Sequence, residues 1–390
     1  MLSVGPHMDY DEPLFFQVMR YATRADRDVI DMVSGSPDWE PPAALRSGLA
    51  AYAEAEPDAF QYPPSEGLRG LREEIAARRN VDVERVIVTN GAGEANYLAM
   101  AGALERGTSA GEPAARSGDA AGGSEFLLTD PVYPYYPGKA DLLDATASFV
   151  PAEPDGSLDP AAVRERAAAA GDDLAAILVN TPNNPTGAVY DPETVAALAD
   201  IAAEHDALLI ADEVYDKYDY TGRFESALTL DRDHVVVTNA FSKSMAITGF
   251  RVGYAVLPEA MVGDARTRHM LVNVATSRPA QQAVLDALRE TGPEYYQRNR
   301  ERMAERVATF TDALDAAGAE YTEPDGGFYV MARFEGFPGT LENVKRLVDE
   351  AGVAGMPGEA FGDARSDWLR FALVSPRVEE AADRLAAFFA

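Results

Sequence analysis

The sequence contains no cysteine among its 390 residues. Disulfides, thiolate nucleophiles and cysteine-ligated zinc or iron–sulfur sites are therefore excluded. Histidine is also scarce, and the residues present show no pairing at metal-ligand spacing: His7, His205, His234 and His269. We therefore predict that the protein binds no metal ion.

Basic side chains are few. The chain has 34 Lys and Arg against 64 Asp and Glu, which gives a formal net charge of −30, and its lysines are only Lys139, Lys217, Lys243 and Lys345. This charge repels phosphate backbones and anionic bilayers, so we predict neither nucleic acid nor a membrane as a partner. An acid-rich, lysine-poor composition resembles that of salt-adapted cytoplasmic proteins, whose carboxylates hold water and cations while salt screens their repulsion. We therefore expect a halophilic protein.

Long apolar runs are missing as well. No stretch approaches 18 uninterrupted apolar residues, and the N-terminus shows no basic segment followed by an apolar run. We therefore expect a cytoplasmic protein with no membrane-spanning segment. With 47% hydrophobic and 25% charged residues the balance is that of an ordinary globular chain, and the length predicts two or three domains.

Short apolar runs rich in β-branched residues alternate with helical stretches. We predict strands over residues 86–89, 126–129, 177–179, 208–211, 235–238 and 253–256. Apolar strands separated by helices indicate an α/β fold with a mostly parallel sheet flanked by helices. Residues 108–124 are rich in Gly, Ala and Ser, which predicts an exposed loop.

The pattern changes after about residue 285, where long charged helices precede a strand at 326–330. We interpret residues 51–285 as a large domain and residues 286–390 as a smaller α+β domain. Residues 1–50 are interpreted as an N-terminal arm that completes the small domain.

A glycine-containing turn, Thr-Asn-Gly-Ala-Gly-Glu at 89–94, follows a predicted strand and opens a helix. The N–H groups of such a turn can bind a phosphate. Two nucleotide-binding fingerprints nevertheless fail, because Asn96 stands where a dinucleotide site needs a small residue and no P-loop Gly-Lys-Ser/Thr follows. Taken alone, the turn favours a purely structural role.

Polar motifs follow other apolar strands, at the strand ends where open α/β sheets bind ligands. They read NTPNNPTG at 180–187, ADEVY at 211–215 and AFSKSMAITGFRVGY at 240–254, and the chain also carries SGSPD at 34–38, YPPSEGLR at 62–69, PGEAFG at 357–362 and LRFA at 369–372. In this order the motifs resemble the pyridoxal-phosphate-dependent aminotransferases of fold type I, the aspartate aminotransferase-like class I/II superfamily. The resemblance spans nearly the whole chain.

This resemblance implies pyridoxal 5′-phosphate as cofactor and gives catalytic roles to matching residues. Lys243 would hold the cofactor as a Schiff base and then move the proton between the substrate α-carbon and the cofactor. Asp212 would keep the pyridine nitrogen protonated, while Asn184 and Tyr215 would bond the phenolic oxygen. From the residues alone, Lys243 could instead be a solvated surface lysine and Asp212 a helix N-cap.

The resemblance also assigns the cofactor's phosphate and ring. Arg251 would bind the phosphate together with the backbone of Ala92 and Gly93 and the hydroxyl of Ser242. Tyr133 would stack on the pyridine face, although a tyrosine there could equally be a core residue.

Further matches concern the substrate and the assembly. Arg370 would bind the α-carboxylate bidentately, with Asn184 and the Gly35 backbone beside it. Tyr62 and Ser277 would reach the cofactor phosphate of a neighbouring subunit, which implies a homodimer with shared active sites.

We therefore predict an aminotransferase that moves an amino group from an L-amino acid to a 2-oxo acid by a ping-pong mechanism. A pyridoxal-phosphate-dependent carbon–sulfur lyase would share the same residues and is the alternative. A regulator that uses such a domain as a sensor would need to bind DNA, which the charge of −30 opposes.

Substrate preference must come from residues that face the substrate side chain. The lysine that some aspartate-selective relatives use near Gly93 is missing, whereas Phe15, Phe16 and Trp39 lie in segments that line the entrance in relatives. We therefore expect apolar or aromatic amino donors. Arg278, or an arginine of a partner subunit, could still bind a distal carboxylate.

Overall fold

The computed structural model describes residues 12–106 and 123–389. His7 and almost all of the loop predicted over 108–124 fall outside these ranges. The strands are β1 (Ile30–Asp31), β2 (Val86–Thr89), β3 (Glu125–Asp130), β4 (Thr146–Pro151), β5 (Leu174–Asn180), β6 (Leu208–Asp212), β7 (Val235–Ala240), β8 (Gly253–Val256), β9 (Glu320–Tyr321), β10 (Tyr329–Arg333), β11 (Val353–Ala354), β12 (Met356–Pro357) and β13 (Leu369–Ala372).

Helices separate most of these strands. They are α1 (Leu14–Arg24), α2 (Ala43–Tyr52), α3 (Arg69–Arg79), α4 (Ala92–Glu105), α5 (Tyr135–Leu142), α6 (Pro160–Ala170), α7 (Pro192–Glu204), α8 (Phe241–Ser244), α9 (Glu259–Asn273), α10 (Arg278–Glu290), α11 (Pro293–Ala316), α12 (Leu341–Arg346) and α13 (Val378–Phe389). Shorter helical turns include η1 (Pro57–Phe60) and η6 (Leu347–Ala351).

Within the described ranges a seven-stranded sheet has the order β2-β8-β7-β6-β5-β3-β4. All its pairings are parallel except those of β8, which runs antiparallel to both neighbours. The predicted mostly parallel sheet is confirmed. The six strands predicted between residues 86 and 256 lie in it, and β4 is an addition that the sequence analysis did not foresee. The strand predicted at 326–330 begins later than expected, as β10, and belongs to the small sheet.

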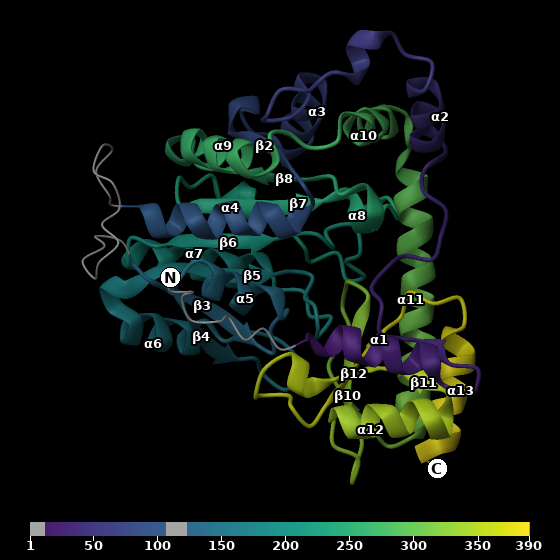
Figure 1. The fold of residues 1–390 in the computed structure, drawn as a ribbon. Helices are drawn as coiled ribbons and strands as arrows, with labels where there is room; N and C mark the ends of the chain where they lie inside the picture. The colour runs from purple at the N-terminus through teal and green to yellow at the C-terminus, as the bar shows by residue number, and fades with distance from the viewer. Residues whose placement is uncertain (1–11, 107–122, 390) are drawn as a thin grey trace, which may run out of the picture.

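Burial explains the composition of the central strands. Every residue of β5 is buried, because helices cover both faces of a parallel sheet. Ile177 and Val179 pack on one side against α6 and α7, whereas Ala176 and Leu178 pack on the other against α4, α5 and α9. Figure 1 shows α4 lying along the sheet. Because the strands are parallel, their carboxyl ends and the loops that follow them lie at the same edge of the sheet.

Helix starts in this part follow the expected capping chemistry. Asp191 caps α7 by accepting from the Thr194 N–H at 2.7 Å, and Pro192 occupies the first turn, where its missing N–H costs nothing. Asp159 and Pro160 begin α6 in the same way.

A second, antiparallel sheet has the order β12-β13-β10-β9. Beside it β1 pairs in parallel with β11, with Ile30 opposite Val353, so the N-terminal segment joins the C-terminal part of the chain. Figure 1 shows α1 lying near α12, β12 and β11, and α11 running from the level of α10 to that of α13. The small α+β unit is thus built from both ends of the chain, and the boundaries at residues 50 and 285 stay a prediction.

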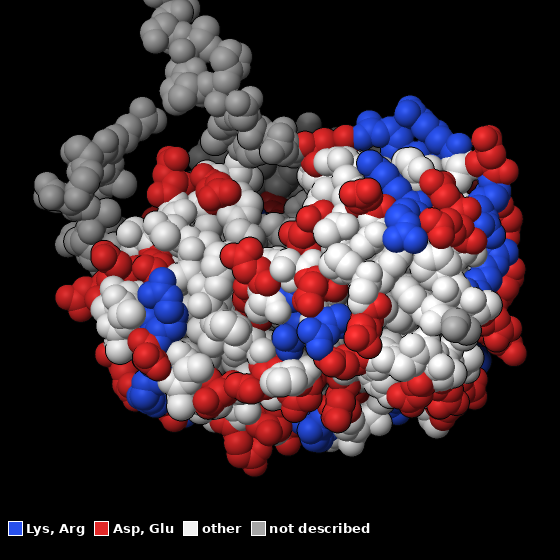
Figure 2. Space-filling view, turned by 90° about the horizontal axis from the view of Figure 1, so that it is seen from below, with Lys and Arg blue, Asp and Glu red and all other residues white. Residues whose placement is uncertain are grey.

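None of the helices in residues 12–106 and 123–389 has both the length and the apolar character required to cross a bilayer. On the face seen in Figure 2, red Asp and Glu residues are spread among white ones, and the blue Arg and Lys residues form smaller clusters. The negative charge of the sequence is therefore carried on the surface.

Candidate active site

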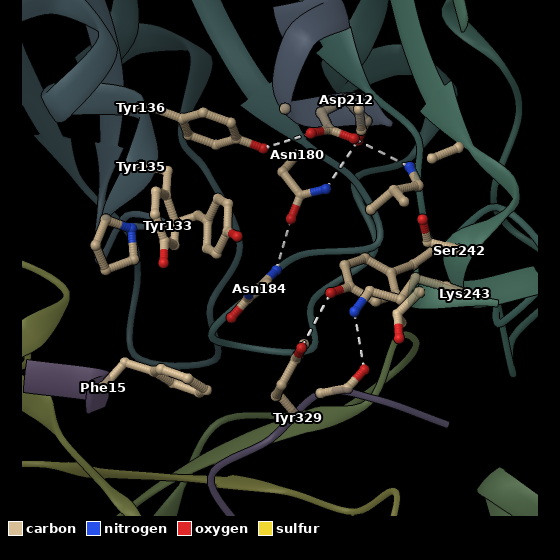
Figure 3. A pocket seen from close by; sticks show the side chains of 18 of the residues that line it. Phe15, Tyr133, Tyr135, Tyr136, Asn180, Asn184, Asp212, Ser242, Lys243 and Tyr329 are labelled. Carbon is tan, nitrogen blue, oxygen red and sulfur yellow. Dashed lines mark hydrogen bonds between the residues drawn. The ribbon is translucent and has the colours of Figure 1, made fainter. Parts of the chain in front are cut away.

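A cavity of about 450 Å³ opens where the loops after the large sheet's strands meet the small sheet and the N-terminal segment. Its lining brings together most of the residues that the sequence analysis selected: Gly35, Ala92, Gly93, Tyr133, Asn184, Asp212, Tyr215, Ser242, Lys243, Arg251 and Arg370. Residues more than 300 positions apart thus share one cavity. Figure 3 shows Asp212 on one side of it, with Lys243 and Tyr329 on the other.

Lys243 lies in the short helix α8, directly after β7, and its side chain faces the cavity. The Nζ donates a hydrogen bond to the Gly35 carbonyl at 2.8 Å. Burial lowers the pKa of Lys243, and the nearby Arg370 and Arg251 act in the same direction. A lysine with a depressed pKa supplies the neutral amine that a nucleophile needs. The side chain is not a solvated surface lysine.

Asp212 ends β6 and is 3% exposed. Its Oδ2 accepts from Asn96 Nδ2 at 2.7 Å and from the Tyr136 hydroxyl at 2.8 Å, and its Oδ1 accepts from the Val214 N–H at 3.1 Å. Burial raises the pKa of Asp212, and these donors oppose that effect by stabilising the carboxylate. The contact with Val214 lies in a turn and no helix begins there, so Asp212 is not the helix N-cap of the alternative interpretation, and the residue lines the cavity.

Asn96 and Tyr136 bond the Asp212 carboxylate, and the sequence analysis did not select them as site residues. The Thr238 hydroxyl donates to Asn96 Oδ1 at 2.6 Å, which orients the amide so that its NH₂ points to Asp212. The only sequence signal was the position of Asn96 one turn after Gly93, on the helix face that returns to the sheet. No pattern linked Tyr136 to Asp212, because 76 residues separate them.

The loop after β5 positions Asn184. Asn180 donates through Nδ2 to the Asp212 carbonyl and accepts through Oδ1 from the Asn184 N–H, both at 2.8 Å. Asn184 Oδ1 in turn accepts from Arg370 Nη1 at 3.2 Å. This chain of bonds fixes the Asn184 amide between the carboxylate end and the guanidinium end of the cavity. Figure 3 shows Asn180 and Asn184 in this line.

Arg370, on β13, is 5% exposed. Its Nη2 donates to the Val33 carbonyl at 2.6 Å, and its guanidinium lies over the rings of Tyr329 and Phe361 at 4.4 and 4.9 Å. Its Nε has no hydrogen-bond partner within the described ranges. A buried guanidinium with a carbonyl as partner, and no carboxylate, can bind an anionic ligand.

A second region with free N–H groups and a guanidinium, which could bind an anion, lies at the start of α4. The helix begins at Ala92, so its first N–H groups have no partners within the helix. Gly91 has φ +79°, and a Cβ added there would lie 2.4 Å from Arg251 Nη2, so glycine allows the guanidinium to approach. Arg251 is held by the carbonyls of Thr248 and Asn90 at 3.0 and 3.1 Å.

Aromatic side chains form another wall. Figure 3 shows Phe15, Tyr133 and Tyr135 across the cavity from Lys243. Lys139 also lines the cavity, which the sequence analysis did not foresee. Its Nζ donates to the Tyr135 carbonyl at 3.1 Å, and burial lowers the pKa of Lys139 to about 8 against the attraction of Asp212.

Some residues expected near the site lie elsewhere. Trp39 is buried against Tyr218 and Phe328, so its expected place at the entrance is wrong: the ring completes the core of the small unit. Phe16 is 49% exposed and packs on the far side of Phe15.

The residues expected to act across a dimer do not line the cavity of their own chain. Tyr62 is 83% exposed beyond η1, and Ser277 precedes α10. Arg278 also lies outside the cavity, where its Nη1 donates to the carbonyls of Asp58 and Gln61 at 2.9 and 3.1 Å.

A buried ionic cluster supports the turn that follows Asp212. Arg79 donates to Glu213 at 3.3 Å, to Asp216 at 2.6 Å and to the Tyr254 hydroxyl at 2.7 Å. The Glu213 side chain is fully buried, and burial raises its pKa to about 7 despite Arg79. Removing the guanidinium would leave the buried Glu213 carboxylate without its cation, and Asp216 would keep only Lys217, at 3.2 Å.

We therefore expect Arg79→Met to lower the free energy of unfolding by about 3–5 kcal/mol at neutral pH. The loss should be smaller at pH 5 than at pH 8, because the folded-state pKa of Glu213 is raised, and burying its charged form costs stability as pH rises through that pKa. Urea unfolding at both pH values measures this. Arg69→Met, on the exposed face of α3, is the control and should change little. An equal loss at both pH values would contradict the argument.

Comparison with known proteins gives consistent matches over most of the chain. The sequence model of the family described as aminotransferase class I and II matches residues 27–386. The probable aspartate/prephenate aminotransferase of Thermus aquaticus is 31% identical over 372 residues, covering 92% of this chain and 91% of that protein. The aspartate aminotransferase of Thermotoga maritima is 30% identical, with coverages of 93% and 91%. A single mutant of the Thermus thermophilus aspartate aminotransferase superimposes with a TM-score of 0.87 at 27% identity, covering 98% of this chain and 99% of its own.

Proposed function

The chain belongs to the aminotransferase class I and II family, and from that premise we propose the roles of its site residues. It is an aminotransferase that depends on pyridoxal phosphate and moves an amino group from an amino acid to a 2-oxo acid. The alternative of a carbon–sulfur lyase is not favoured, since the matched relatives carry aminotransferase names. The observation that carries the proposed roles is the meeting of Lys243, Asp212 and Arg370 in one cavity.

The residues present fit pyridoxal phosphate. The open start of α4 with Arg251 and Ser242 matches a phosphate, and the buried carboxylate of Asp212 matches a protonated ring nitrogen. When bound, the cofactor supplies an electron sink for the negative charge that develops at the substrate α-carbon. We propose that Asn184 and Tyr215 bond its phenolic oxygen and that the Tyr133 ring covers its face.

The catalytic work of the chain itself centres on Lys243. Its neutral Nζ would hold the cofactor, and the same Nζ, once free, would accept the proton of the substrate α-carbon. Arg370 fixes the substrate α-carboxylate, with Asn184 orienting the guanidinium. Position 35 must be glycine for Tyr329 to lie where it does, because a Cβ added to Gly35 would lie 1.9 Å from the Tyr329 hydroxyl.

The transfer is tested with purified enzyme, amino donors and 2-oxoglutarate. We expect the donor's oxo acid to exceed one equivalent per site only when an acceptor is present, with the parallel double-reciprocal plots of a ping-pong cycle. Steady release of ammonia or a thiol without an acceptor would contradict the proposal and identify a lyase.

We propose that the enzyme is a homodimer in which each subunit completes its neighbour's site. Apolar side chains at the end of α9 face solvent in the single chain: Leu271, Val272 and Val274 are 78%, 68% and 52% exposed. Arg278, a few residues later, binds the loop that carries Tyr62. These neighbouring exposed segments offer one surface for a second copy.

Tyr62→Phe is expected to weaken cofactor retention because it removes a hydroxyl that we place against the neighbour's phosphate. The measurement is the cofactor dissociation constant, by titration of the apoenzyme. Tyr135→Phe, whose hydroxyl lies in the same chain's cavity wall, serves as the comparison. A fully active monomer in light scattering would disprove the shared site.

For the amino donor we propose an apolar or aromatic side chain. Phe15, Tyr133 and Tyr135 line the cavity, and Gly93 carries no cation into it. One buried apolar contact supports a roughly 10- to 200-fold preference in kcat/KM. We therefore expect phenylalanine, leucine or methionine to exceed aspartate in kcat/KM, measured at high salt.

An aspartate preference above about tenfold, or about 1.4 kcal/mol of transition-state binding, would disprove this choice. Lys139 would then be the cation to examine, because it lines the same cavity. In that case Lys139→Met should remove the aspartate preference while leaving phenylalanine unaffected.

We further propose a cytoplasmic enzyme of amino-acid biosynthesis that is adapted to salt. The support is the net charge of −30 and the carboxylates spread over the face in Figure 2. Salt should stabilise such a surface by screening repulsion between like charges.

A further inference from the structure

A buried pair of an acid and an imidazole lies beside the turn at the start of α4. Glu94, in the first turn of that helix, accepts a hydrogen bond at Oε1 from His269 Nδ1 at 2.6 Å. The His269 side chain is fully buried, and the Glu94 side chain is 11% exposed. Neither residue lines the catalytic cavity, and neither has a role in the reaction proposed above.

The Glu94 carboxylate joins two segments of the chain. Its Oε2 accepts from the N–H of Asn90 at 2.6 Å, and its Oε1 also accepts from the side-chain amide of Asn273. His269 and Asn273 belong to α9, whereas Asn90 belongs to the turn before α4. An ionised carboxylate can only accept hydrogen bonds, so His269 Nδ1 carries the proton of the bond that it shares with Glu94.

The His269 ring makes no second hydrogen bond among the described residues. Its Nε2 is buried and has no partner there. Buried polar atoms in native proteins are nearly always hydrogen-bonded, so burying this ring has a cost that the contact with Glu94 offsets. Because α9 packs against α4, that contact fixes the carboxylate from behind the turn.

The backbone of Asn90 is held at both of its polar groups. Glu94 binds its N–H, and Arg251 Nη2 donates to its carbonyl at 3.1 Å. The next residues, Ala92 and Gly93, line the catalytic cavity, and their N–H groups have no acceptor within the helix. The orientation of these N–H groups and of the guanidinium therefore depends on how Asn90 is held.

We propose that Glu94 is a positioning residue for the cofactor phosphate and that His269 and Asn273 hold its carboxylate in place. This role rests on the function proposed above, in which the start of α4 and Arg251 bind that phosphate. Glu94 does not touch the phosphate, because the two charges have the same sign and both carboxylate oxygens already have donors. It fixes Asn90 before the ligand arrives, which lowers the ordering cost of binding.

The phosphate group itself provides the test. The full chain, freed of cofactor, is titrated with pyridoxal 5′-phosphate and separately with pyridoxal, which has the same ring without the phosphate. The visible band of the bound form is followed. In Glu94→Ala we expect the dissociation constant for pyridoxal 5′-phosphate to rise by about tenfold or more, and that for pyridoxal by less than about twofold. A merely structural defect would weaken both ligands alike, because both present the same ring to Lys243 and Asp212.

Two variants on α9 complete the comparison. Asn273→Ala removes one of the three donors to the carboxylate, so we expect a smaller rise of about threefold, again confined to pyridoxal 5′-phosphate. Glu259→Ala removes the same charge from the exposed start of α9 and should change neither dissociation constant. Asn273→Ala decides the matter if Glu94→Ala does not fold.

Arg251→Gln separates this inference from the function on which it rests. That variant should weaken pyridoxal 5′-phosphate selectively, because it removes a direct phosphate contact. A selective loss in Arg251→Gln with none in Glu94→Ala would overturn the positioning role alone, and so would an equal loss of both ligands in Glu94→Ala. Unchanged affinity in both variants would show that the phosphate binds elsewhere, and then the proposed phosphate site would fail together with the role of Glu94.

Discussion

Lys243→Ala should lose transamination by at least about 10⁴-fold in kcat/KM, because one side chain is removed from both the covalent step and the proton transfer. The cavity offers one other amine, Lys139, whose Nζ bonds the Tyr135 carbonyl on the opposite wall and cannot take over. The steady-state rate with donor and 2-oxoglutarate measures the loss. Lys345→Ala, at a residue packed over Tyr21 far from the cavity, should retain full activity.

A chemical measurement accompanies the kinetics. Borohydride fixes the cofactor to the lysine that holds it, and mass spectrometry of the digest then identifies that residue. The label is expected on Lys243 in the unsubstituted enzyme and should be absent in Lys243→Ala. A label on Lys139, Lys217 or Lys345 in the unsubstituted enzyme would show that the site is misassigned.

Asp212→Asn is expected to keep the cofactor through the phosphate contacts and to lose about 10³-fold in kcat. A buried carboxylate acting on a positive charge over about 4 Å, at an effective dielectric of about 20, is worth about 4 kcal/mol, and that free energy corresponds to about 10³ in rate. The asparagine keeps the shape of the side chain while removing its charge. The rate of the half-reaction with donor alone is the measurement, followed at the cofactor's absorption band.

Tyr136→Phe gives the graded comparison for Asp212→Asn. It removes one of the donors to Oδ2 and leaves Asn96 in place, so we expect a loss nearer tenfold. Near-normal turnover in Asp212→Asn would remove the carboxylate from the mechanism. A Tyr136→Phe loss as large as that of Asp212→Asn would show that the hydroxyl does more than hold the carboxylate.

The fold was predictable wherever burial imposes a local pattern. β5 and β6 are apolar over most of their length because both faces are covered, and such runs stand out in a sequence. β4 alternates buried and exposed residues at the edge of the sheet, so it lacked that signal. The reversed direction of β8 depends on its pairing with β2 and β7, which no local pattern records.

The residues of the site also fall into two groups: those that a local motif reveals and those that only the folded chain brings together. Lys243 and Arg251 lie eight residues apart, so the short motif that contains both could be recognised in the sequence. Asn96 and Tyr136 act on Asp212 across 116 and 76 residues, so only the folded chain joins them. Trp39 misled the sequence analysis because an aromatic residue in a loop fits an entrance and a core equally well until its neighbours are known.

Helix α11 extends over 24 residues, which at 1.5 Å per residue makes a rod of about 36 Å. One end follows α10 beside the large sheet, and the other packs on α13 in the small unit. Because the helix is long, a rotation of its axis by about 5° about the Pro293 end displaces the Ala316 end by about 3 Å. Such a turn would move the small unit, with Arg370 on β13, by a bond length or two relative to Asp212 and Lys243 beside the large sheet.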